Sequence, residues 1–198
     1  MKPVRLAILG LGTVGGGALK LLQENAAEIR RRTDREIQVT HVGTRRPRPD
    51  LNLADSIKQS ADLMEIVRQP DVDIVVEVMG GIHPAYELIM EAMKHGKHVV
   101  TANKALLAEH GTALFKAADE YKVQIAYEAA VAGGIPIIKV IREGLAANRI
   151  DGLAGIINGT GNFILSEMRE KGRAFEDVLT EAQALGYAEA NPTTDVEG

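Results

Sequence analysis

Three glycines at a fixed spacing form the clearest chemical motif in the chain. They follow a short apolar run, residues 4–9, and precede apolar residues at helical spacing, within the segment Gly10-Leu11-Gly12-Thr13-Val14-Gly15. In a strand–turn–helix, the first glycine makes the tight turn, the second lets backbone approach a pyrophosphate, and the third allows close helix–strand packing. The helix N-terminus adds free N–H groups and the positive end of a dipole. The motif predicts dinucleotide binding; a tight turn without a ligand would not need three glycines so spaced.

Arginines stand where such a site often carries an acidic residue. A carboxylate about 20 positions after the glycines usually holds the ribose hydroxyls of NAD. Here the second expected strand, residues 36–42, ends in Gly43-Thr44-Arg45-Arg46-Pro47-Arg48. Guanidinium groups suit a 2′-phosphate, which they hold by paired hydrogen bonds. We therefore expect NADP(H) to be preferred, with Arg45 as its ligand and NAD(H) as the other cofactor; the alternative interpretation is a solvated basic loop.

Two further segments end expected strands at the edge where ligands of open α/β sheets bind. Val78-Met79-Gly80-Gly81 ends the third strand, and Gly80 would let the nicotinamide-side ribose lie close to backbone. Thr101-Ala102-Asn103-Lys104 ends the fourth, and Lys104 would face the cleft and polarise a carbonyl or carboxylate. The alternatives are a plain glycine turn and a surface lysine at a helix start.

Three more small-residue or polar loops are candidates for ligand contact. Residues 128–136 present carbonyl oxygens and the carboxylate of Glu128, a set that suits a hard cation. Residues 158–162 form a second candidate turn, with Asn162 expected to cap the next helix. Glu189 and Asp195 follow the last expected helix, and both are equally compatible with solvent-exposed turns.

Composition excludes several other classes of function. The 198 residues contain no cysteine, which rules out disulfides, cysteine zinc sites and thiol nucleophiles and fits a reducing compartment. The 5 histidines lack metal-ligand spacing with supporting carboxylates, so none is assigned a catalytic role. A net charge of −4 gives no electrostatic case for nucleic acid. No apolar stretch reaches the roughly 20 residues of a membrane span, and a cytoplasmic location is expected.

The expected elements alternate along most of the chain. Strands are expected at 4–9, 36–42, 73–78, 98–101 and 123–127, with helices at 13–28, 61–68, 84–94, 104–121 and 135–146. This alternation predicts an α/β fold, a doubly wound, mostly parallel sheet covered on both faces. Beyond residue 148 the pattern changes to a strand at 150–157 and helices at 163–171 and 175–185. We therefore expect a cofactor-binding domain at 1–148 and an incomplete second domain at 149–198.

Taken together, these segments resemble the homoserine dehydrogenases, NAD(P)H enzymes that reduce aspartate 4-semialdehyde to homoserine. The resemblance covers essentially the whole chain and follows the family's order through GLGTVG at 10–15, EVMGG at 77–81, HVVTANKALLA at 98–108, YEAAVAGGIP at 127–136, GIINGTGNFIL at 155–165 and LGYAEANPTTDVEG at 185–198. It implies a Rossmann-type sheet followed by the start of an α+β substrate and dimerisation domain, in a homodimer or larger oligomer that acts in threonine, methionine and isoleucine biosynthesis.

The resemblance also implies roles for individual residues. Lys104 would contact both cofactor and substrate, Glu189 would bind the substrate's amino group, and Gly186 would contact the cofactor near the nicotinamide. The amides of Thr13 and Val14 would meet the cofactor phosphates. A sodium ion would be held by Glu128 and by the carbonyl oxygens of Val131, Gly133 and Ile135.

One departure from the family pattern concerns the proton donor. The family motif continues past residue 198 with an aspartate and then a lysine that protonates the carbonyl oxygen. We therefore expect an N-terminal fragment that binds NADP(H) and turns over little. The alternatives are another dehydrogenase of amino-acid-like substrates or a non-catalytic NAD(P)-binding sensor. Aspartate-semialdehyde dehydrogenase is disfavoured, because its chemistry uses a cysteine.

Overall fold

The computed structural model describes residues 2–46, 48–51, 53–156, 158–185 and 187–188. Its contacts group the chain into two compact units, Met1–Ala146 and Ala147–Gly198. Each unit is described by itself. Among the described residues, no helix combines the length and the apolarity needed to cross a bilayer.

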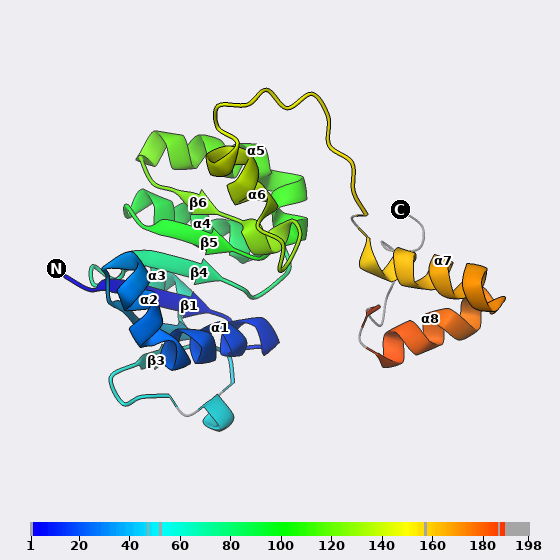
Figure 1. Ribbon diagram of the computed structural model, residues 1–198. Coiled ribbons are helices and arrows are strands. Elements are labelled where there is room, and N and C mark those ends of the chain that lie inside the picture. Colours follow the sequence, from blue (N-terminus) through cyan, green and yellow to red (C-terminus); the bar gives the residue numbers. More distant parts are fainter. Residues whose placement is uncertain (1, 47, 52, 157, 186, 189–198) are drawn as a thin grey trace. The chain divides into compact units, whose positions relative to one another are not determined.

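The first unit is built on a six-stranded parallel sheet, drawn from blue to green in Figure 1. Its order is β3-β2-β1-β4-β5-β6, which confirms the predicted doubly wound α/β fold. The strands are β1 (Val4–Leu9), β2 (Ile37–Gly43), β3 (Lys58–Ser60), β4 (Ile74–Glu77), β5 (His98–Thr101) and β6 (Ile125–Ala126). The strand order reverses between the neighbouring strands β1 and β4, and open sheets bind ligands at such a switch point.

The helices of this unit cover both faces of the sheet. Alternate residues of β1 point to opposite faces: Ala7 and Leu9 belong to one buried cluster, and Ile8 belongs to the other. The first cluster packs against α3 (Leu63–Arg68), α4 (Ala85–Lys94) and α5 (Lys104–Tyr121). The second packs against α1 (Thr13–Glu24) through Leu19. Both faces of the central strand are therefore dry, as a parallel sheet requires.

Three local expectations within this unit need correction. The helix expected at 13–28 breaks at Asn25, which ends α1 and begins α2 (Ala26–Thr33). The edge strand β3 was missed, because its residues are polar and only its pairing with β2 identifies it. The stretch expected as one helix at 135–146 is a single turn of α6 (Ile137–Lys139) followed by a π-helical turn at Val140–Gly144. Short 3-10 turns lie at Pro49–Leu51 and Glu128–Ala130.

The described residues of the second unit form two helices, α7 (Gly159–Lys171) and α8 (Phe175–Ala184); both were expected, and α7 begins earlier than predicted. Asn158, rather than Asn162, caps α7, because its side-chain oxygen accepts a hydrogen bond from the Gly161 amide at 2.7 Å. The rings of Phe163 and Tyr187 meet edge to face at 5.1 Å. Arg173 forms ion pairs with Glu167 of α7 and Glu181 of α8, so both apolar and charged contacts join the helices.

The strand expected at 150–157 is absent from the described part of that range, residues 150–156. Its apolar side chains face solvent, with Leu153 73% and Ile156 78% exposed. A strand needs a neighbouring strand to accept and donate its backbone hydrogen bonds. No described residue pairs with this segment, and the prediction of a strand is wrong for this structure.

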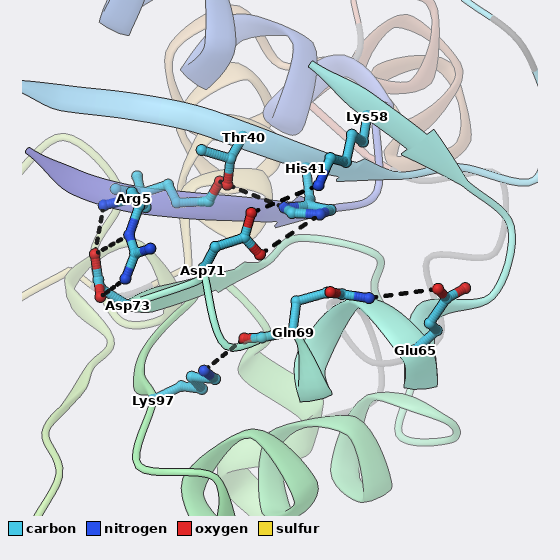
Figure 2. A network of polar contacts seen from close by, with 10 residues as sticks. Arg5, Thr40, His41, Lys58, Glu65, Gln69, Asp71, Asp73 and Lys97 are labelled. Atoms are coloured by element: carbon cyan, nitrogen blue, oxygen red, sulfur yellow. Dashed lines mark hydrogen bonds and ion pairs between the residues drawn. The ribbon is translucent and has the colours of Figure 1, made fainter. Parts of the chain in front are cut away.

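Away from the switch point, a polar network joins β1, β2 and β3 to the segment that precedes β4 (Figure 2). Arg5 donates from Nε and Nη2 to the two carboxylate oxygens of Asp73, at 3.1 and 2.9 Å. The Lys97 ammonium, which is buried, donates to the Gln69 carbonyl at 2.7 Å. The hydrogen bond from Arg5 holds the pKa of the Asp73 carboxyl below its ordinary value. Because both partners are about one-third exposed, solvent screens the pair and its contribution to stability is small.

His41 of β2 is the buried histidine of this network. Its Nε2 lies 4.0 Å from Oδ1 of Asp71, an oxygen with no hydrogen-bond partner among the described residues. Lys58 on β3 lies 3.6 Å from the other oxygen of Asp71. Burial lowers the pKa of the His41 imidazole, opposed by Asp71 and Glu65 and reinforced by Lys58.

This burial predicts a pH-dependent stability. The unfolded chain binds a proton at His41 below about pH 6.5, whereas the folded chain keeps the imidazole neutral to a lower pH. The unfolding free energy is therefore highest, with respect to His41, above about pH 6.5. It falls as the pH drops through the folded-state pKa, by at most about 1.4 kcal/mol per pH unit. We expect His41→Gln to flatten the dependence of the unfolding free energy on pH between about 7 and 5. The measurement is urea unfolding, with the exposed-site variant His95→Gln as control; equal slopes in wild type and His41→Gln would contradict the prediction.

Candidate functional site: a cleft at the carboxyl edge of the sheet

The carboxyl ends of β2, β1 and β4 surround a cleft of about 510 Å³. The sheet register places Gly43, Leu9 and Glu77 in one row, so the segments that follow them emerge side by side. The cleft is lined by Gly10, Leu11, Gly12, Gly43, Thr44, Arg45, Arg46, Arg48, Leu63, Val78 and Met79. The structure thus brings the glycine motif and the basic loop, some thirty residues apart in sequence, to one site.

The three glycines have different geometries, each in line with its expected use. Gly10 has φ +99°, and a Cβ there would lie 2.9 Å from the Val78 carbonyl oxygen. A Cβ on Gly15 would lie 1.8 Å from the carbonyl oxygen of Gly10, so only glycine lets α1 approach β1 this closely. A Cβ on Gly12 would meet no atom within 4 Å. The second glycine therefore borders open space, which leaves its backbone accessible to a ligand.

The N-terminus of α1 has no side-chain cap. Gly12 occupies the cap position without a side-chain hydrogen bond, as do the cap residues of α2, α4 and α8, whereas α3, α5 and α7 have side-chain caps. The first amides of a helix need an acceptor from outside the helix. The uncapped turn at Thr13 and Val14, both exposed, therefore suits an anion such as a pyrophosphate.

The basic loop after β2 presents two arginines without a carboxylate partner among the described residues. Arg45 and Arg46 are exposed and line the cleft, and the Thr44 hydroxyl fixes the loop by donating to the Arg46 carbonyl at 2.7 Å. Arg48 differs, because it pairs twice with Asp50 and also donates to the Leu11 carbonyl in the glycine turn. The cradle of glycines, the uncapped helix and the unpaired guanidinium groups together fit a phosphorylated dinucleotide.

The next two predicted segments lie further along the same edge. Gly80 and Gly81 have φ of +76° and +75°, a conformation that favours glycine and makes the turn after β4. Lys104 is the first residue of α5, at the carboxyl end of β5; its side chain is exposed and is not part of the lining of the 510 Å³ cleft. Its expected contact with a ligand stays a prediction.

Glu128 has a structural role that the sequence did not indicate. Its carboxylate oxygens accept hydrogen bonds from the Ile138 and Lys139 amides at 2.8 and 3.0 Å, at the start of α6. Among the described residues there is no group of three or more His, Asp or Glu side chains placed to hold a metal. The sodium site would depend on the carbonyl oxygens of Val131, Gly133 and Ile135, and it stays a prediction.

Three candidates, Gly186, Glu189 and Asp195, lie outside the described residues. Sequence reasoning also missed one polar cluster, Glu77, Thr101 and Asn103, which is buried beside the cleft. The signal was present as a carboxylate inside an apolar strand. A second cleft, of about 640 Å³, lies between α5, β6 and α6 and gave no sequence signal, because it is lined by residues of mixed charge and polarity.

Fold and site together define a dinucleotide-binding domain of the Rossmann type. The sequence comparisons give the family. Residues 10–128 match the family description "Homoserine dehydrogenase, NAD binding domain", and residues 136–198 match "Homoserine dehydrogenase". The chain belongs to the homoserine dehydrogenase family, which confirms the predicted resemblance.

Individual relatives agree with this assignment. The homoserine dehydrogenase of Pseudomonas aeruginosa is 61% identical over 198 residues, covering 100% of this chain and 45% of that protein. The homoserine dehydrogenase of Bacillus subtilis is 40% identical and is covered to 46%. The crystal structure of a homoserine dehydrogenase from Thiobacillus denitrificans gives a TM-score of 0.92 at 58% identity, over 99% of this chain and 46% of that one. A hyperthermophilic archaeal homoserine dehydrogenase in complex with NADPH gives 0.83 at 29% identity, over 100% and 66%. The chain thus spans about half the length of the curated relatives it matches.

The glycine geometries predict that the same substitution impairs ligand binding at Gly12 and stability at Gly15. Gly12→Ala places its methyl group in the open space of the cleft, so we expect it to lower the unfolding free energy by about 1 kcal/mol or less. The methyl group would obstruct a ligand there, so we expect dinucleotide affinity to fall about tenfold or more. Gly15→Ala meets the Gly10 carbonyl, and we expect it to lower the unfolding free energy by roughly 3 kcal/mol. Urea unfolding and calorimetric titration with NADPH measure both. Unimpaired NADPH binding by Gly12→Ala would contradict the role of that glycine.

Proposed function

We propose that the chain binds NADP(H) in the 510 Å³ cleft, with the pyrophosphate at the start of α1 and the 2′-phosphate at Arg45. The observation that carries the proposal is the meeting of the uncapped glycine turn with arginines that have no carboxylate partner in the described part of the chain. The backbone amides of Thr13 and Val14 would donate hydrogen bonds to the phosphates. Gly80 would leave room for the nicotinamide-side ribose. NAD(H) would bind the same turn without the contribution of Arg45.

We also propose the reaction of the whole protein, the interconversion of aspartate 4-semialdehyde and homoserine. The cofactor supplies the hydride, which passes between nicotinamide C4 and the carbonyl carbon. Lys104 would stabilise negative charge that develops on the carbonyl oxygen, and Glu189 would bind the substrate's amino group. Gly186 would contact the cofactor near the nicotinamide. Such placed charges act on the transition state more than on the bound substrate.

Three related expectations belong to the same proposal. The cofactor domain would span 1–148, and residues 149–198 would begin the substrate and dimerisation domain of a homodimer or larger oligomer. A sodium ion beside Glu128 would order the loop at 131–135. The enzyme would act in the biosynthesis of threonine, methionine and isoleucine, in the cytoplasm.

The cofactor preference is tested by removing one guanidinium group. We expect Arg45→Ala to weaken NADPH binding about tenfold, because a charge-assisted contact with the 2′-phosphate is lost. NADH binding should change less than about twofold. Calorimetric titration of both cofactors measures this, and Arg30→Ala, on α2 and outside the cleft lining, is the matched control. Equal loss for both cofactors would show that Arg45 does not contact the 2′-phosphate.

The proposed activity is tested by homoserine-dependent reduction of NADP+, followed by absorbance. The assay uses a protein of the relatives' length that carries these 198 residues, beside the 198-residue chain itself. In the longer protein we expect Lys104→Met to lower kcat roughly a hundredfold while NADPH still binds. Lys116→Met, an exposed position on the same helix, should leave the rate unchanged. Cofactor binding without any homoserine-dependent rate in the longer protein would contradict the proposed activity and favour a nucleotide sensor.

A further inference from the structure

The described part of the molecule contains one fully buried carboxylate at the edge of the cofactor cleft. Glu77, the last residue of β4, is 0% exposed. Among the described residues it has no ion pair with a lysine, arginine or histidine. A buried charge without a counter-ion is costly, because water no longer solvates it. It persists in folded proteins when hydrogen bonds replace the lost solvation.

Two hydrogen bonds supply that solvation, and one of them comes from a residue that lines the cleft. Oε1 of Glu77 accepts from the Met79 amide at 2.9 Å, and Met79 is itself a cleft-lining residue. Oε2 accepts from the hydroxyl of Thr101 at 2.7 Å, across the β4–β5 pair in which the two residues face each other. The carboxylate therefore connects the turn after β4 with the end of β5.

The connection continues to the first turn of α5. The Thr101 hydroxyl oxygen accepts from the Asn103 amide at 3.1 Å. The Asn103 side chain caps α5 by accepting from the Leu106 amide at 3.1 Å, and its Nδ2 donates to the Gly81 carbonyl at 2.5 Å. Thr101 and Asn103 are both buried. The chain of hydrogen bonds thus ends at the Gly80–Gly81 turn. Lys104 directly follows Asn103 in the sequence.

The donor pattern explains why a carboxylate suits this position. Both groups that meet Glu77 are donors, and an ionised carboxylate offers acceptors only. A glutamine carries a single carbonyl oxygen in place of the two carboxylate oxygens, so it would accept from one donor and present N–H to the other. A buried donor left unpaired costs about 1–3 kcal/mol. An apolar residue would leave both donors without a partner.

We propose that Glu77, acting through Thr101 and Asn103, is a positioning residue for the nicotinamide half of the cofactor. It fixes the Gly80–Gly81 turn and the start of α5 relative to each other, whereas the adenosine half depends on Gly12 and Arg45. This inference rests on the proposed binding of NADP(H). It adds that two different groups of residues at the carboxyl edge of the sheet hold the two halves of the cofactor.

The test compares two ligands that share the adenosine half. Adenosine 2′,5′-bisphosphate carries the 2′-phosphate and adenosine but lacks the nicotinamide ribose, and NADPH carries both halves. We expect Thr101→Val to raise the Kd for NADPH about tenfold and that for the bisphosphate less than about twofold. The matched control Thr101→Ser keeps the hydroxyl and should bind both ligands as wild type does.

A second variant guards against loss of folding. Asn103→Ser keeps a good helix cap but is too short to reach the Gly81 carbonyl, so it should give the same split between ligands. A general structural role would weaken both ligands alike. If Thr101→Val and Asn103→Ser each weakened the binding of NADPH and of the bisphosphate equally, the positioning role would be overturned. It would also be overturned if neither variant changed the Kd of either ligand. If the wild-type protein bound neither ligand, the proposed function itself would fail. That result is distinguishable from the two outcomes in the variants, because it is seen without any substitution.

Discussion

The close approach of α1 to β1 is the constraint on which the site depends. The Gly15 backbone passes so near the Gly10 carbonyl that a single methyl group would overlap it. This contact directs the first turn of α1 toward the end of the sheet, where its amides have no side-chain cap. The same approach puts Gly10 against Val78 at the end of β4. The glycine–glycine contact therefore lets the N-terminus of α1, the positive end of its dipole, lie close to the end of β1.

Charged groups divide between the two edges of the sheet in a way that supports this site. At the amino edge, Arg5 pairs with Asp73 and Lys97 donates to a carbonyl, so those cations are satisfied internally. At the carboxyl edge, Arg45 and Arg46 border the cleft with no carboxylate partner among the described residues. The buried carboxylate at that edge, Glu77, is satisfied by donors rather than by an arginine. The guanidinium groups of the basic loop thus remain available to a phosphate.

Much of this arrangement follows from the sequence, because the signals are local and repeated. The alternation of strands and helices predicted the parallel fold. The three glycines and the arginines after β2 predicted the cofactor contacts, and the structure brings those residues together. Elements defined by partners were harder to predict. Lys58-Gln59-Ser60 forms a strand only through pairing with β2, and the apolar residues at 150–156 form none because no described segment pairs with them. Asn158, and not Asn162, caps α7, because the helix starts earlier than its apolar spacing suggests. The role of Glu77 depends on two donors from different strands, which no local pattern shows.

The most direct test of the central claim is hydrogen exchange of the backbone amides with and without NADPH. If the cofactor binds at the carboxyl edge near β1, exchange should slow at residues 12–16, 44–46 and 79–81. The larger cleft between α5, β6 and α6 provides the contrast within the same unit. Slowing confined to residues 124–128 and 138–143, with the glycine turn unchanged, would contradict the account.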